Sequence, residues 1–216
     1  MSVTWLPDLY GDLVPSEHLL GIAHPHNPLV RRILWGDRTA EAELVGRYEA
    51  LHPIWTSWAA EHEQCYTLPL EAALASCAPA VTLEISAGTG QATPLVSSVA
   101  STLVCSEPSS SMANELLART GALVVRAASL LPFADASFDR IVGLNAVPCA
   151  SELRRVLVPG GAVTLCYSFA EQTPVFVEPL ELSRALGLSA VCQRVGFGMA
   201  VVLTDNIGDG ATKEKS

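Results

Sequence analysis

The fold is decided by the stretch Val81-Thr82-Leu83-Glu84-Ile85-Ser86-Ala87-Gly88-Thr89-Gly90-Gln91. Its apolar and β-branched residues end at Ile85, and small residues with two glycines follow. This pattern predicts a buried strand, a tight turn and the start of a helix. Glycine lets the backbone approach a ligand closely, and the amide groups at a helix start favour an anionic group. The stretch therefore predicts a ligand-binding loop or, as the plainer alternative, a turn that only joins strand to helix.

Downstream of this stretch, apolar runs alternate with helical patterns, which is typical of βαβ units and a parallel sheet. The last two apolar runs are separated by a short turn at Gly196, so we expect them to pair antiparallel. The prediction is an α/β fold with a mostly parallel sheet and an antiparallel edge strand. Its seven strands are expected at Val81–Ile85, Thr102–Ser106, Leu123–Ala127, Arg140–Leu144, Ala162–Tyr167, Ala190–Val195 and Gly198–Thr204.

Upstream, the pattern predicts a helix over Ala40–Glu63 and a second over Leu68–Ala78, ended by Pro79. Residues Met1–Arg38 are rich in Pro, Gly and His, and we expect an irregular extension with short helices. We therefore divide the chain into an N-terminal extension and helical cap (1–66), a sheet domain (67–204) and a flexible tail (205–216).

The amino-acid composition limits which partners the protein can bind and which chemistry it can perform. The chain has 216 residues, half of them hydrophobic, and a formal net charge of −9. Nucleic-acid affinity needs Lys and Arg against phosphates, so we expect no nucleic-acid partner. The lysines are Lys213 and Lys215, near the end of the sequence, which excludes chemistry that needs a buried lysine.

Cysteines and the N-terminal residues indicate the compartment. The six cysteines form no CxxC pair and have no metal-ligand spacing with histidine, so we expect reduced thiols and no metal site. Asp8, Asp12 and Glu17 stand where a signal peptide needs a basic start, and no apolar run reaches membrane-spanning length. We expect a soluble, cytoplasmic protein with no membrane partner; homo-oligomers stay open.

An acid follows the second predicted strand. Glu107 lies about 20 residues beyond the glycine turn, where a nucleotide-binding βαβ unit places the acceptor for both ribose hydroxyls. A dinucleotide fingerprint needs a third glycine, but Thr93 stands there, and no Tyr-x-x-x-Lys is available because no lysine precedes Lys213. These departures count against a nicotinamide-dependent oxidoreductase.

Four segments, in order, resemble class I S-adenosylmethionine-dependent methyltransferases of the menaquinone/ubiquinone-biosynthesis type, or methyltransferase type 11. They are Glu84–Gly90, Cys105–Met112, Leu131–Asp139 and Glu152–Gly161. The resemblance covers about Arg47 to Thr204. It implies a Rossmann-like, doubly wound, seven-stranded fold, S-adenosylmethionine as cofactor and S-adenosylhomocysteine as product.

The resemblance also implies a cofactor site at the turn after strand one, the acid after strand two and the segments that follow. The turn would hold the methionine moiety, Glu107 the ribose, Ala128 and Ser129 the adenine edge, and Asn145 and Ala146 the methyl donor. The implied residues are Glu84, Ser86, Ala87, Gly88, Gly90, Glu107, Pro108, Met112, Ala128, Ser129, Asn145, Ala146 and Tyr66.

Two positions depart from that family. Ser86 stands where its first motif begins its glycines, and Ala127 replaces an acid that often meets the adenine amino group. We therefore expect weaker cofactor binding than is usual in the family.

No catalytic base is defined by the sequence. All tryptophans and histidines precede Tyr66, so a base would have to come from the N-terminal region. The candidates are His18, His24, His26 and Tyr66, although His24 and His26 also fit a solvated, proline-rich loop. Methyl displacement needs alignment of the two reactants more than it needs a base.

The segment before Tyr66 is expected to cap the acceptor side of the site. Its apolar side chains include Trp5, Leu6, Tyr10, Leu19, Leu20 and Trp35. The alternative is that they pack behind the sheet or at a dimer contact. Trp55 and Trp58 share one helix face, which most often means core packing.

The leading hypothesis is a methyltransferase that acts on a small-molecule substrate. The first alternative is a protein of the same fold, with weak or no catalysis, that serves as a binding or scaffold partner. The second is a protein or nucleic-acid methyltransferase, which the acidic charge disfavours.

Overall fold

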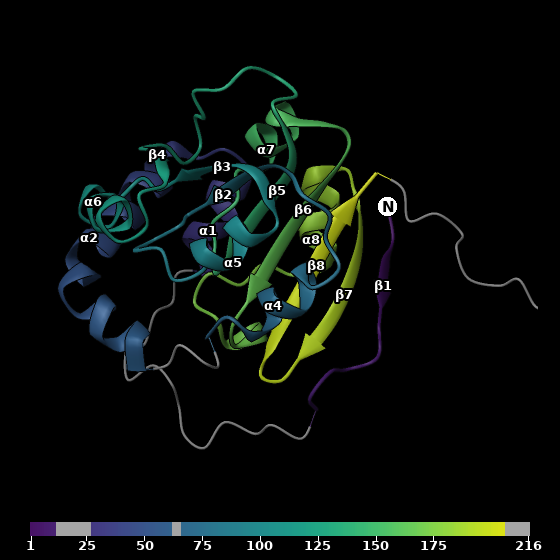
Figure 1. Ribbon diagram of the computed structural model, residues 1–216. Coiled ribbons are helices and arrows are strands. Elements are labelled where there is room, and N and C mark those ends of the chain that lie inside the picture. The colour runs from purple at the N-terminus through teal and green to yellow at the C-terminus, as the bar shows by residue number, and fades with distance from the viewer. Residues whose placement is uncertain (12–26, 62–65, 206–216) are drawn as a thin grey trace, which may run out of the picture.

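The computed structural model describes residues 1–11, 27–61 and 66–205, and all structural statements below concern these residues (Figure 1). One sheet of eight strands runs through the molecule in the order β1-β7-β8-β6-β5-β2-β3-β4. The strands are β1 (Val3–Trp5), β2 (Ala80–Ile85), β3 (Ala100–Ser106), β4 (Leu123–Val125), β5 (Phe138–Leu144), β6 (Leu157–Tyr167), β7 (Ser189–Val195) and β8 (Gly198–Thr204). The helices are α1 (Asn27–Leu34), α2 (Arg38–Glu61), α4 (Leu68–Leu74), α5 (Thr93–Ser98), α6 (Ser110–Thr120), α7 (Ala150–Val156) and α8 (Pro179–Leu186), with a short 3-10 turn at Ala170–Gln172.

The predicted α/β fold is confirmed. Within the group β2 to β6, all adjacent strands pair parallel. Strand β8 pairs antiparallel with both β6 and β7. Each of the seven predicted strands overlaps an observed strand. The helix predicted over Leu68–Ala78 is shorter than expected and ends at Leu74.

An eighth strand corrects the expectation for the N-terminus. For Met1–Arg38 we expect an irregular extension with short helices, and α1 is such a helix, but Val3–Trp5 pairs parallel with Ala190–Cys192 of β7. An edge strand leaves a row of backbone groups unpaired, and β1 satisfies those of β7. Trp5 lies at this edge, where its ring is 6.0 Å from the guanidinium carbon of Arg194. The first eleven residues thus extend the sheet beside β7 (Figure 1).

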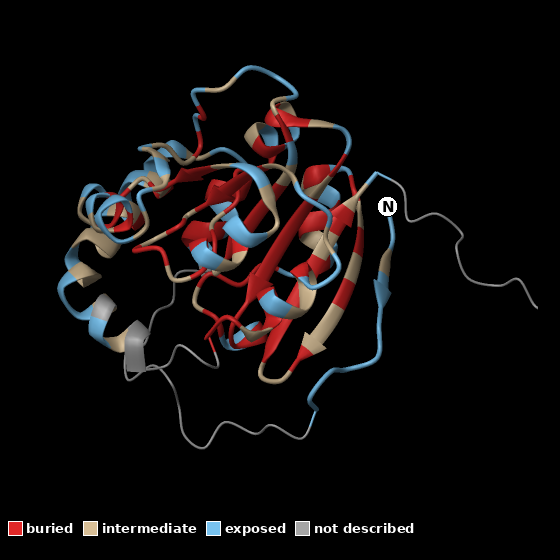
Figure 2. Cartoon of the chain, viewed as in Figure 1, coloured by how far each residue is buried: buried red, intermediate tan, exposed pale blue. Residues whose placement is uncertain are grey.

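Helices cover both faces of the sheet, because successive strand residues point to opposite sides. Ile141 belongs to a core shared with α1, α7 and α8, while the next residue, Val142, packs with α4 and α5. The buried strands therefore run between two helical layers (Figure 2). No described helix has the length and apolar character needed to span a lipid bilayer.

Helix α2 is held to α6 by polar contacts. The Glu49 carboxylate accepts hydrogen bonds from the first backbone amides of α6, those of Ser110 and Ser111. One turn further along, His52 Nε2 lies 2.9 Å from Glu115 Oε2. The first N–H groups of a helix lack partners within it, so Glu49 satisfies donors that would otherwise need water. These contacts place α2 beside the carboxyl ends of the central strands.

Candidate functional site

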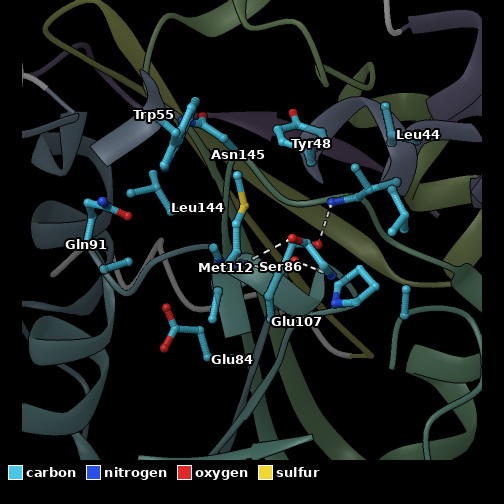
Figure 3. A pocket seen from close by; sticks show the side chains of 18 of the residues that line it. Leu44, Tyr48, Trp55, Glu84, Ser86, Gln91, Glu107, Met112, Leu144 and Asn145 are labelled. Carbon is cyan, nitrogen blue, oxygen red and sulfur yellow. Dashed lines mark hydrogen bonds between the residues drawn. The ribbon is translucent and has the colours of Figure 1, made fainter. Parts of the chain in front are cut away.

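A cavity lies at the carboxyl ends of β2, β3 and β5, with α1 and α2 forming its other wall (Figure 3). It encloses about 830 Å³, counting its open mouth. The carboxyl ends of parallel strands are where open α/β sheets bind ligands. The lining residues are Ile33, Glu41, Leu44, Val45, Tyr48, Trp55, Tyr66, Glu84, Ser86, Ala87, Gly88, Gln91, Ala92, Glu107, Pro108, Ser109, Met112, Ala128, Leu144, Asn145 and Val147.

Two non-glycine residues with left-handed backbone form the floor of the cavity. Ser86, directly after β2, has φ of 49°, and Asn145, directly after β5, has φ of 50°. The departure from glycine at position 86 therefore keeps the backbone conformation that glycine adopts readily. The Ser86 hydroxyl accepts a hydrogen bond from the Val147 backbone amide at 3.3 Å. Such strained positions concentrate at functional sites, and here both strand ends face one cavity.

Glu107 ties together the loops after β2 and β3. Its Oε2 accepts a hydrogen bond from the Gly88 amide at 2.8 Å, and its Oε1 accepts one from the Ser109 amide at 2.8 Å. Burial raises the pKa of Glu107 to about 7, although both amides act in the opposite direction. Each carboxylate oxygen keeps lone-pair capacity for a ligand donor. The side chain is therefore fixed in position with acceptor sites left for hydroxyl groups.

Glu84 is a second buried acid in the same cavity. It is 1% exposed, and the Cys105 thiol donates to its Oε2 at 3.4 Å. Burial raises the pKa of Glu84 to about 7, opposed by the hydrogen bond from Cys105. Together with Glu41, three carboxyl groups line the cavity, and the described lining contains no Lys, Arg or His. The cavity therefore favours a cationic ligand over an anionic one.

Aromatic rings occupy one end of the cavity, opposite Glu84 (Figure 3). Trp55 stands between Tyr48 and Tyr66, with ring centroids 6.4 Å and 6.1 Å away, and Trp58 packs on it at 5.4 Å. Burial raises the pKa of Tyr66 to about 12, opposed by a hydrogen bond with the Asn145 side chain. Tyr66 is therefore a neutral phenol near neutral pH and is unsuited to act as a base.

A second, smaller cavity, which encloses about 390 Å³ counting its open mouth, adjoins this aromatic end. It shares Tyr48, Trp55, Tyr66 and Asn145 with the first cavity, and no charged side chain is among its described lining. The remaining lining residues are Leu51, Trp58, Phe169, Thr173, Pro174 and Val175. The two cavities thus form one site with an acidic part and an apolar part.

Most of the residues predicted for the cofactor lie together. Ten of them line the first cavity: Glu84, Ser86, Ala87, Gly88, Glu107, Pro108, Met112, Ala128, Asn145 and Tyr66. Ser129 is buried at its border, where its backbone amide is 3.4 Å from Glu41 Oε1. His18, His24 and His26 fall outside the described residues.

Gly90 and Ala146 do not line the cavity. Gly90 has φ of 91°, and a Cβ there would lie 2.8 Å from Leu116 Cδ1, so this glycine allows the turn to pack on α6. Ala146 is 1% exposed, and a Cβ on Gly143 would lie 2.5 Å from its methyl group. Both positions therefore shape the core around the site.

The residues that we expected to cap the site are not the ones that line the cavity. Trp5, Leu6 and Tyr10 lie with β1 at the opposite edge of the sheet, and Trp35 is 65% exposed and outside the cavity lining. Leu19 and Leu20 fall outside the described residues. The cavity wall comes instead from α1 and from the α2 face that carries Glu41, Leu44, Tyr48 and Trp55.

Sequence reasoning missed the α2 residues before Trp55. Positions 41, 44, 48 and 55 recur at helical spacing and share one face, which is the signal that could have found them. The same face carries Trp55 and, one turn on, Trp58. These two tryptophans, predicted to be core residues, do pack with the core and also line the site.

Comparison with known proteins gives a family match within the sheet domain. Residues 83–165 match the family model described as a methyltransferase domain, of type 11. A search of curated proteins finds no significant match. All four sequence motifs fall within this match, and two of them, Glu84–Gly90 and Cys105–Met112, contribute residues to the acidic cavity.

Solved structures show the same fold. A Thermotoga maritima S-adenosylmethionine-dependent methyltransferase, described as a possible histamine N-methyltransferase, is 21% identical over 74% of this chain and 98% of its own, with a TM-score of 0.59. DhpI in complex with SAH is 17% identical over 76% and 96%, with a TM-score of 0.58. A chain of the complex between the Haloferax volcanii Trm112 methyltransferase activator and a methyltransferase is 14% identical over 74% and 97%, with a TM-score of 0.57. The predicted Rossmann-like methyltransferase fold is confirmed.

Proposed function

We propose that the protein transfers the methyl group of S-adenosylmethionine to a small, uncharged, largely apolar acceptor, and the match of residues 83–165 to a methyltransferase domain supports this reaction. The acidic cavity binds the cofactor, and the adjoining aromatic cavity binds the acceptor. The cofactor supplies an electrophilic methyl group on a sulfonium, and the chain's own side chains bind and orient the two reactants.

The acidic lining is the observation that carries the cofactor assignment. S-adenosylmethionine has a sulfonium and an ammonium group, and the cavity offers buried carboxyl groups with no basic side chain in its described lining. A pyrophosphate-containing dinucleotide would instead place two negative charges among these acids. Glu107 is held by two backbone amides and retains acceptor capacity, which suits the ribose hydroxyls. The residues present therefore fit this cofactor.

The aromatic cavity supports the acceptor class. Small-molecule sites are mostly apolar with a few oriented polar groups, and here Asn145 and the Tyr66 phenol provide these groups. The Asn145 amide is itself oriented by Ser168, which donates its backbone N–H to Oδ1 at 2.9 Å and accepts from Nδ2 at 2.9 Å. Alignment of acceptor and methyl donor can supply much of the acceleration without a base.

A transfer assay tests this function. Purified protein is incubated with methyl-labelled S-adenosylmethionine and either a small-molecule extract or a macromolecular fraction. We expect label in small products only. Trp58→Ala should lower this transfer roughly tenfold or more by removing a wall of the acceptor cavity, while S-adenosylhomocysteine affinity stays unchanged. Leu117→Ala, at a residue that is 53% exposed on α6, is the control.

Other outcomes reject specific parts of the proposal. Label in the macromolecular fraction alone would reject the small-molecule acceptor. Cofactor binding without transfer to either fraction would instead favour the non-catalytic alternative.

The buried acids also predict a pH dependence. Glu84 and Glu107 have folded-state pKa values of about 7, above the ordinary 4.5, so the folded protein keeps protons that the unfolded chain releases. The resulting stability is fully present below pH 4.5 and is lost as pH rises through about 7. A cationic cofactor favours the charged carboxylates, so its stabilising effect should grow over the same window.

Thermal unfolding measures this linkage. Without ligand, the Tm should fall between pH 5 and pH 8, and the Tm increase caused by S-adenosylmethionine should be larger at pH 8 than at pH 6. An increase of equal size at both pH values would contradict the assignment of these acids to the cationic cofactor. The Glu84→Gln variant should show a weaker pH dependence.

A further inference from the structure

We propose that Glu41, on helix α2, reads the adenine base of the cofactor by accepting a hydrogen bond from its amino group. The inference rests on the proposed function, because it needs S-adenosylmethionine in the acidic cavity. It assigns cofactor selectivity to a residue outside the matched methyltransferase domain.

At the border of the acidic cavity, two buried polar atoms have no hydrogen-bond partner among the described residues. Glu41 Oε1 accepts from the Ser129 backbone amide at 3.4 Å, but Glu41 Oε2 is buried with no hydrogen-bond partner among the described residues. The Ser129 hydroxyl is also buried and likewise has no partner there. Leaving a buried polar atom unpaired is costly, so such groups are nearly always satisfied. Their occurrence together at the border of a cavity indicates a polar ligand group that the cavity receives.

The strand order places the adenine at this end. Four strands lie side by side in the order β5-β2-β3-β4, and their ends carry Asn145, Ser86, Glu107 and, just beyond β4, Ser129. The aromatic acceptor cavity adjoins Asn145, so the methyl group belongs at the β5 end. With the ribose at Glu107, the base extends toward Ser129 and Glu41.

The surroundings fit a flat base. Ile33, Leu44 and Val45 line the cavity from α1 and α2, while Pro108 and Met112 line it from the loop after β3 and from α6. An apolar slot of this kind accommodates the faces of a ring and leaves its polar edge to be matched by hydrogen bonds.

The donor and acceptor types match adenine. One edge of adenine has an amino donor next to a ring-nitrogen acceptor, and proteins read bases by hydrogen bonds along that edge. Glu41 Oε2 provides an acceptor, and the Ser129 hydroxyl, which has no partner among the described residues, can act as the donor beside it. An ionised carboxylate can only accept, so it would face a carbonyl oxygen unfavourably if the amino group were replaced. Glu41 thus discriminates an amino group from an oxo group.

The test compares S-adenosylhomocysteine with S-inosylhomocysteine, in which oxygen replaces the amino group. By calorimetry, the wild-type protein should prefer the adenosyl compound roughly 10- to 100-fold, the scale of a hydrogen bond to a charged group. Glu41→Gln keeps the side-chain volume and adds an N–H₂ donor, so this preference should fall at least tenfold. The matched control is Glu43→Gln, two residues along the same helix, whose exposed carboxylate pairs with Arg47.

The outcomes separate the two proposals. If the wild-type protein binds neither compound, the proposed cofactor is wrong. If it binds S-adenosylhomocysteine, and the preference for the adenosyl compound is the same in Glu41→Gln, Glu43→Gln and wild type, the proposed recognition of adenine by Glu41 is overturned. Because the preference is a ratio measured on one protein, partial unfolding of a variant does not alter it. Glu41→Ala, which removes both acceptor and donor, should also lose the preference.

Discussion

Replacing Glu107 with alanine is expected to weaken S-adenosylhomocysteine binding roughly 10- to 100-fold, since hydrogen bonds to a charged group contribute about 1.5–3 kcal/mol. The carboxylate is 4% exposed and is fixed by the amides of Gly88 and Ser109. Its loss removes the proposed ribose acceptor and also the link between the loops after β2 and β3. Calorimetric titration at pH 8, where the carboxyl is charged, measures the effect.

The control for this variant is Glu178→Ala, at an exposed residue whose side chain makes no capping hydrogen bond. Circular dichroism must show that Glu107→Ala is folded, because the variant leaves two backbone amides without their acceptor. If the folded variant binds S-adenosylhomocysteine as tightly as wild type does, Glu107 is not a cofactor residue.

Phe138→Ala should give a large loss of stability, about 3–5 kcal/mol, which is typical of deleting a buried phenylalanine. Phe138 begins β5, is 3% exposed, and meets the ring of Phe133 edge-on at a centroid distance of 4.9 Å. Neither ring lines the cavity. The motif that contains both residues therefore acts through packing, and denaturant unfolding should reveal the loss.

A matched comparison is Leu123→Ala, at a residue that is 63% exposed on β4, which should change stability by less than about 0.5 kcal/mol. Folded Phe138→Ala should still bind S-adenosylhomocysteine with wild-type affinity. A Phe138→Ala variant with wild-type stability that no longer binds S-adenosylhomocysteine would show that we have assigned the wrong role to this motif.

The regular part of the fold was predictable because local signals and tertiary structure agree. Strands β2 to β8 are apolar runs bounded by turn residues, and the Gly196 turn correctly indicated the antiparallel pair. Strand β1 could not be predicted in the same way. Its three residues have no periodic pattern, and they become a strand only because β7 offers them an edge.

The candidate site likewise has one part that the sequence predicts and one part that depends on tertiary contacts. Ser86, Gly88 and Glu107 follow strands in a recognisable order, so their convergence could be expected. The contribution of α2 depends on how that helix docks on α6 through Glu49 and His52, which are about 60 residues away from their partners in sequence. Local sequence carries no information on such a contact. The packing of Gly90 against α6, outside the cavity lining, could not be predicted for the same reason.

Helix α2 carries both Glu41 and the tryptophans of the aromatic cavity, and it lies wholly outside residues 83–165. Under the proposed function, mutations in this one helix change which acceptor is methylated while residues 83–165 preserve the chemistry. For protein engineering, α2 is the segment to randomise when a new acceptor is sought, with position 41 held constant.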